Sequence, residues 1–184
     1  MKLIRRIAFL LLILAAAPVL HLVAHEKGFP SATLKKVFPD ATGFTARKKT
    51  LTAEQLKKAE QESGSKVQRN DNPFGFYVAL GKSADGSGVL GTVLMLDTRG
   101  PKGGIDLAVG VRRDGSVHRV VVVENSDDPA LAQAAFLDQI QGKSAKSPLK
   151  TGQDIRFSGN AQAADAVLSA VRRGLFLLGA AQGN

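Results

Sequence analysis

The strongest constraint on the fold is residues 103–125, which read GGIDLAVGVRRDGSVHRVVVVEN. Two runs rich in β-branched residues flank Asp114–Gly115, and an Asp-Gly pair is a favoured two-residue turn between antiparallel strands. This segment therefore predicts a β-hairpin. Its second arm contains the continuous apolar run Val120–Val123, which predicts a strand buried on both faces. Two further strand candidates, residues 75–82 and 89–98, precede the hairpin.

Two helices are predicted ahead of these strands. Residues 51–64 (LTAEQLKKAEQESG) combine a capping box, formed by Thr52 and Gln55, with Gly64 as a stop signal. The segment TLKKVFPD, residues 33–40, predicts a brief helix that ends at its proline. Both would supply helical cover for the strands that follow.

Two more helices are predicted after the hairpin. Residues 127–144 place Pro129 in a first turn and Gly142 at the end, which is typical of a single helix. Residues 145–157 read as a loop that enters a short extended piece, and the last helix is predicted from 160 to 178. The order of elements indicates an α+β fold, in which helices pack against an antiparallel sheet.

The N-terminal segment, residues 1–25, has a basic start followed by the apolar run Ile7–Ala24, about eighteen residues long. It predicts either an uncleaved transmembrane anchor or a cleaved signal peptide, and both imply export. The basic start keeps the N-terminus cytoplasmic. The predicted organisation is the anchor or signal segment at 1–25, a linker at 26–33 and a folded domain at 34–184.

Composition narrows the classes of site. The chain has no Cys, which excludes disulfides, Cys-ligated zinc, iron–sulfur clusters and cysteine catalysis. The net charge is +9, but the basic residues are dispersed and aromatic residues make up only 5%. This pattern argues against nucleic-acid binding and predicts a solvated basic surface that can face anionic lipid.

Conventional catalytic and metal-binding sets are missing from the sequence. His21 and His25, four residues apart, could be a haem or metal pair, or two polar residues where an anchor leaves the membrane. His118 follows the hairpin turn. It could serve as a general base, but no Ser or Asp partner is visible in the sequence and it is predicted to face solvent. Asp127 and Asp128 are predicted to mark a helix N-terminus, although a pair of aspartates could also work as acid and base. We therefore assign no catalytic residue and no metal ligand.

The stretch FSGNA, residues 157–161, is the best candidate for a binding site. A turn of Ser158, Gly159 and Asn160 leads directly into the last predicted helix. A helix N-terminus has free N–H groups and a positive dipole end, which suits a phosphate. Ser and Asn are also common as plain helix caps.

Residues 34–178 resemble the FMN-binding domain found in the covalent-flavin subunits of sodium-pumping NADH:quinone reductase and of the Rnf complex. The segment GPKGGIDLAVGVRRDGSVHRVVVVEN resembles the central hairpin of that family, and LAQAAFLDQIQGKS resembles the helix after it. FSGNAQAADAVLSAV aligns without gaps to the segment of the family that reads like ISGATITSRAVVDAV. The resemblance implies an FMN site at Ser158, Gly159, Asn160 and Ala161.

The modification signature of the family is absent. The family esterifies a Thr to the phosphate of FMN, and the aligned residue here is Ala161, which has no hydroxyl. Asn160 replaces the usual Ala, while Ala163 and Ala164 replace the usual Thr and Ser. Ile155 matches the usual Asp, although Asp154 is adjacent, and SDDPAL stands where relatives often have a Glu-Thr-Pro-Gly-like turn. Any FMN would therefore be held non-covalently.

The resemblance implies three functional alternatives. The chain could hold FMN and carry electrons beside a membrane redox complex, or dock as a flavin-free accessory or assembly subunit of a membrane respiratory complex. It could also bind another small ligand in the same cleft. The expected partners are the membrane and subunits of a redox complex, without nucleic acid. The expected location is the bacterial inner membrane, with the body in the periplasm.

Overall fold

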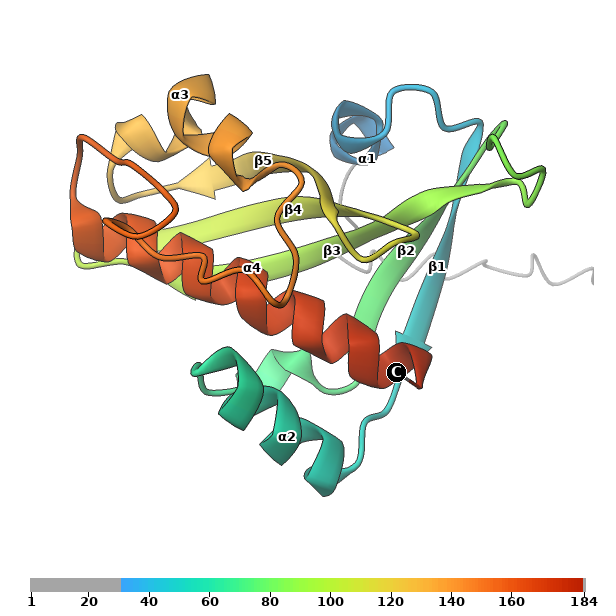
Figure 1. Cartoon of the computed structure of the whole chain (residues 1–184), viewed down its shortest axis with the longest axis horizontal. Helices are drawn as coiled ribbons and strands as arrows, with labels where there is room; N and C mark the ends of the chain where they lie inside the picture. Colours follow the sequence, from blue (N-terminus) through green and yellow to red (C-terminus); the bar gives the residue numbers. More distant parts are fainter. Residues whose placement is uncertain (1–30, 184) are drawn as a thin grey trace, which may run out of the picture.

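A computed structural model describes residues 31–183 of the chain (Figure 1). It confirms the α+β prediction: five strands form one antiparallel sheet in sequence order. The strands are β1 (Gly43–Lys49), β2 (Phe74–Leu80), β3 (Val89–Arg99), β4 (Gly104–Arg112) and β5 (Val117–Asn125). The predicted anchor or signal segment, with His21 and His25, lies outside the described residues.

Helices and short 3-10 turns surround the sheet. They are α1 (Ser31–Val37), α2 (Ala53–Ser63), η1 (Arg69–Asp71), η2 (Pro129–Ala132), α3 (Ala134–Leu137), η3 (Asp138–Ile140) and α4 (Ala161–Gln182). The predicted caps of α2 are confirmed: the Thr52 hydroxyl accepts from the Gln55 N–H at 3.2 Å, and the Gln55 side chain accepts from the Thr52 N–H at 2.9 Å. Gly64 ends this helix with a φ of +69°. The first helix starts at Ser31, three residues before the predicted start of the domain.

The hairpin of β4 and β5 forms as predicted, with Gly115 in the left-handed region. Its connection is longer than the predicted two-residue turn: β4 ends at Arg112, β5 begins at Val117, and the Gly115 N–H donates to the Arg112 carbonyl at 3.0 Å. The prediction for Val120–Val123 is only half right, because β5 is the edge strand of the sheet. Val120 is buried, while the three following valines are half-buried. Their side chains alternate between the two faces, and an edge strand has no outer neighbour to complete their cover.

The single helix predicted for residues 127–144 is wrong. The chain instead makes the three short turns η2, α3 and η3. Leu131, Phe136 and Ile140 are the buried residues of this region, and their spacing of five and then four does not form one helical stripe. Separate turns allow all three side chains to reach the core.

Two other sequence-based expectations also differ from the structure. The loop 145–157 contains one isolated bridge between Thr151 and Ile155 and no strand. Strand β1 was not predicted, because its sequence GFTARKK lacks apolar alternation. Most of its residues are exposed, as expected of a strand that forms the basic outer edge of the sheet.

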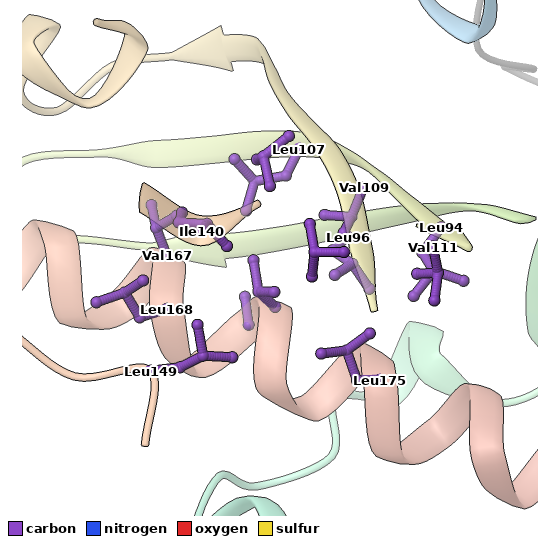
Figure 2. Packing of buried hydrophobic residues seen from close by; sticks show 14 of the residues in the cluster. Leu94, Leu96, Leu107, Val109, Val111, Ile140, Leu149, Val167, Leu168 and Leu175 are labelled. Atoms are coloured by element: carbon purple, nitrogen blue, oxygen red, sulfur yellow. The ribbon is translucent and has the colours of Figure 1, made fainter. Parts of the chain in front are cut away.

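One face of the sheet is covered by α4, which packs along β2, β3 and β4, while α2 packs against α4 from outside (Figure 1). Figure 2 shows strand side chains such as Leu94, Leu96 and Val109 between the sheet and α4, and Val167, Leu168 and Leu175 of the helix belong to the same core cluster. The Cβ position of Gly174 lies 2.6 Å from the Leu96 side chain, so only glycine lets the helix approach the sheet this closely. This face holds the main core, and we call it the α4 face.

The opposite face, which we call the α1 face, carries a second and smaller core. It contains Leu34, Val37 and Phe38 from the α1 segment, packed on Val93 and Ala108 of the sheet. Two glycines allow Val37 and Phe38 to pack closely on the sheet. A Cβ atom at Gly91 would lie 2.6 Å from the Phe38 ring, and one at Gly110 would lie 2.5 Å from Val37. The seven-residue α1 packs on β4 and β5, and so it covers only part of this face.

Candidate functional site

The four predicted binding residues lie together at the start of α4. Asn160 is the N-cap, and its side-chain oxygen accepts from the N–H groups of Gln162 at 3.0 Å and Ala163 at 3.2 Å. Its backbone carbonyl accepts from Ala164 at 3.1 Å. Ser158, Gly159 and Ala161 are exposed. The helix therefore supplies its own acceptor for the N–H groups that the sequence offered to a phosphate.

Asp128 takes up a further N–H group of the same turn. Its Oδ2 accepts from the backbone N–H of Asn160 at 2.7 Å, and its Oδ1 accepts from Ala130 at 2.9 Å. The hydrogen bonds from Asn160 and Ala130 lower the pKa of this carboxyl, so it is ionised at neutral pH. The Cβ position of Gly159 falls against Oδ2, which leaves the carboxylate in contact with the turn. The ionised Asp128 carboxylate thus lies beside the backbone of the turn that was expected to bind FMN.

The neighbouring Asp127 holds a different loop. Its Oδ2 accepts from the N–H groups of Lys102 at 2.5 Å and Gly103 at 3.0 Å, in the glycine-rich segment RGPKGG. The Cβ position of Gly100 lies 2.6 Å from the same oxygen. The prediction of a helix N-terminus is therefore confirmed for Asp128, which caps η2, and wrong for Asp127. Sequence spacing could not reveal this, because the two loops approach from distant parts of the chain.

The residues that differ from the resembled FMN-binding motif lie in packed or hydrogen-bonded surroundings. Ala163 and Ala164 are fully buried in the main core, where a hydroxyl would need a buried partner. Ile155 is also buried, with 1% of its surface exposed. The adjacent Asp154 accepts from the N–H of Lys150 at 3.0 Å and pairs with Lys143 at 3.1 Å, so it organises the preceding loop.

His118 does not face solvent, and this prediction is wrong. Its ring stacks on Phe38 with 4.5 Å between the centroids and an angle of 18° between the planes. Its Nδ1 atom is buried without a hydrogen-bond partner. Burial, followed by the charges of Arg112 and Arg119, lowers the pKa of the imidazole. His118 is a half-buried packing residue beneath α1, and the charge of Asp40 only partly offsets the lowering of its pKa.

A buried ion pair was missed by sequence reasoning. Arg173 of α4 is 3% exposed, and its Nε lies 2.9 Å from Asp71 Oδ2, as an ion pair without hydrogen-bond alignment. Another guanidinium nitrogen donates to the Asp97 carbonyl at 3.0 Å. Burial raises the pKa of Asp71 despite the opposing effects of the Gln68 N–H and Arg173. An arginine within the apolar stripe of a helix was the available signal, and the pair ties α4 to η1 and β3.

Three hollows open on other parts of the surface. One of about 440 Å³ lies on the α1 face and is lined by Leu34, Phe44 and Tyr77, among others. A second of about 440 Å³ lies between α2 and α4, and one of about 280 Å³ lies beside the β4–β5 turn. None of these three includes a residue of 157–161. Across residues 31–183, no cluster of His, Asp or Glu could hold a metal ion, and no helix is long and apolar enough to cross a membrane.

Comparison with known proteins adds no assignment. The chain matches no protein-family model, and no curated protein matches its sequence.

Proposed function

We propose that this chain is a flavin-free accessory subunit, tethered at the extracytoplasmic side of the bacterial inner membrane, that docks on a membrane redox complex. The observation that carries this proposal is the Asp128 carboxylate on the Asn160 N–H. The ionised carboxylate would repel a phosphate at the turn. The N–H groups of Gln162 and Ala163 already donate to the Asn160 side chain, so they are not free to bind a phosphate. The apolar run Ile7–Ala24 supplies the tether.

Non-covalent binding of FMN at Ser158, Gly159, Asn160 and Ala161 is the second candidate. Its support is that these residues are contiguous at the N-terminus of a 22-residue helix, and that three of them are exposed. Bound flavin would supply the redox chemistry, and the turn would only hold its phosphate. The two candidates predict different behaviour of the same purified protein.

Flavin binding by the purified full-length chain decides between them. We expect colourless protein that does not bind added FMN saturably, measured by quenching of flavin fluorescence. The variant Asp128→Asn removes the charge from the turn and is expected to increase the affinity for FMN or inorganic phosphate. Asp138→Asn, which removes an exposed carboxylate of η3, is the matched control and should change nothing. A flavin absorbance band in the native protein, released by acid precipitation, would overturn the flavin-free proposal.

Docking is tested separately by isolation of the native membrane complex. We expect the chain to remain with redox subunits after mild detergent extraction. If it is recovered without them under conditions that keep the complex intact, the accessory role is wrong.

A further inference from the structure

Among residues 31–183, α1 packs mainly on β4 and β5, and we call the part of the α1 face beyond it the open half. On the strands beyond Phe38, four half-buried apolar side chains pack at the margin of the smaller core: Tyr77, Met95, Val121 and Val123. Met95 and Val121 both flank Ala108 in the register of β3, β4 and β5, and thus lie in one row across the sheet. Tyr77 continues this surface into the hollow of about 440 Å³.

A row of three carboxylates borders this apolar surface. Asp97, Asp106 and Glu124 are paired in register across β3, β4 and β5. Like charges directly opposite one another on a sheet are destabilising. Burial raises the pKa of Asp106, and the charges of Glu124 and Asp97 raise it further. Within residues 31–183, Asn70 donates a hydrogen bond to Asp97 at 2.5 Å, and the ion pairs shown there are made by other carboxylates, those of Asp71, Asp85 and Asp154.

This arrangement is unusual for the charge of the protein. The chain has 25 basic and 16 acidic residues, yet three acidic side chains share one row, and the ion pairs shown within residues 31–183 involve other carboxylates. Such a row lowers the stability of the isolated fold, and a cation from outside the chain would remove the penalty. Apolar area beside unneutralised charge of one sign is typical of a surface that meets a complementary partner.

The proposed tether would bring the same face close to the membrane. Ser31, the first described residue, lines the hollow on the α1 face. Six residues separate Ala24, the end of the apolar run, from Ser31, and six extended residues span at most about 20 Å. A tether at Ile7–Ala24 therefore keeps this face within reach of membrane proteins. The acidic row opposes direct contact with anionic lipid.

We infer that the open half of the α1 face docks a membrane-protein segment that carries an apolar strip flanked by Lys or Arg. Resting on the proposed accessory role, this inference identifies the surface through which the subunit binds. The apolar strip covers Tyr77, Met95, Val121 and Val123, and the basic residues pair with Asp97, Asp106 and Glu124. The α2–α4 hollow, on the other side of the sheet, takes no part in the contact.

Photo-crosslinking with the full-length chain in its own host tests this surface. The photoreactive residue p-benzoylphenylalanine replaces Tyr77, where an aromatic ring is already accommodated. The matched control places it at Phe176, which lines the hollow between α2 and α4. We expect a discrete protein adduct from position 77 and none from position 176. Mass spectrometry of the adduct should identify a segment with the apolar and basic pattern.

Charge reversal makes the test specific. The double variant Asp106→Lys/Glu124→Lys should lose the adduct, because like charges then face each other across the interface. The control Glu62→Lys/Asp138→Lys changes the net charge equally at exposed positions elsewhere and should keep it. Replacing the identified basic residues of the partner by Glu should restore the adduct with the reversed chain. Thermal unfolding of each variant verifies that the fold is intact.

The remaining outcomes separate this inference from the proposed function. Three outcomes would show that this surface is not the docking site: an adduct with phospholipid alone, no protein adduct at position 77, or an adduct that does not respond to charge reversal in this chain or in the partner. If position 176 captures a redox subunit and position 77 does not, the surface is wrong while the accessory role stands. If position 77 captures a charge-dependent partner outside any redox complex, the surface stands and the accessory role is wrong.

Discussion

The two faces of the sheet are both apolar, but the protein covers them very differently. The α4 face lies under a 22-residue helix that is itself backed by α2, and its core residues on β3 and β4, such as Leu94, Leu96 and Leu107, are buried. The α1 face has only a seven-residue helix, and apolar side chains beyond it are half-buried. Strand alternation alone would assign similar cover to both faces. Within residues 31–183, the α4 face therefore holds most of the buried core, and the α1 face is the one for which we propose a binding role.

The largest expected effect is on the α4 face. Leu168→Ala removes a fully buried side chain, and its cost should be about 2–5 kcal/mol because the surrounding core relaxes only partly into the cavity. Met95→Ala on the open half of the α1 face should cost about 1 kcal/mol or less, because the side chain is already partly hydrated. Urea unfolding followed by circular dichroism measures both. Equal losses would contradict the division between the two faces.

The close packing of α1 on the sheet is tested next. Gly91→Ala places a methyl group against the Phe38 ring and the Val111 carbonyl, and the backbone cannot yield easily. We expect a loss of about 1–3 kcal/mol in the free energy of unfolding. Gly43→Ala is the matched control, since a Cβ atom there has no neighbour within 4 Å. A neutral result for Gly91→Ala would mean that α1 is not seated as tightly as the structure indicates.

The cap of α4 should have a smaller effect. Asn160→Ala removes the acceptor for the N–H groups of Gln162 and Ala163, which typically costs about 0.5–2 kcal/mol. Asn160→Asp keeps an acceptor and should preserve most of the stability. Chemical unfolding of the pair separates loss of the cap from any effect on ligand binding. Stability unchanged in the alanine variant would show that the cap is dispensable.

The smallest expected effect is a pH dependence on the α1 face. The pKa of His118 lies below its ordinary value of 6.5, so the unfolded chain takes up a proton before the folded protein does. Stability contributed by neutral His118 is present above pH 6.5 and falls as the pH drops toward the pKa of the folded state. His118→Phe, which keeps a ring on Phe38, should flatten this part of the profile. Parallel profiles of the melting temperature between pH 7 and 5 for wild type and variant would argue against it.

The parts of the fold that depend on local signals were predictable. The Asp114–Gly115 turn, the Thr52 capping box and the start of α4 at Asn160 were all predicted, because neighbouring residues alone favour these structures. The run 127–144 was misassigned, since composition favours a helix there and only the positions of buried neighbours divide it into short turns. Strand β1 was missed because an edge strand needs little apolar pattern.

The candidate site divides in the same way. The sequence indicated a helix N-terminus at residues 158–161, and it showed that Ala161 lacks the oxygen for a covalent flavin. It did not predict that Asp128, thirty-two residues earlier, places its carboxylate on the Asn160 N–H. It also did not reveal the acidic row on the α1 face, because Asp97, Asp106 and Glu124 come together only through strand register.

The amino-acid sequence by itself determined the hairpin, the capped helices, the α+β class and the absence of cysteine chemistry, because each follows from residue type and short spacing. The tertiary structure alone decided that an internal carboxylate lies on the turn before α4 and that, among residues 31–183, α1 covers only part of the α1 face. Both outcomes depend on which distant segments meet. Packing and strand register set those meetings, and local propensity contains no information about them.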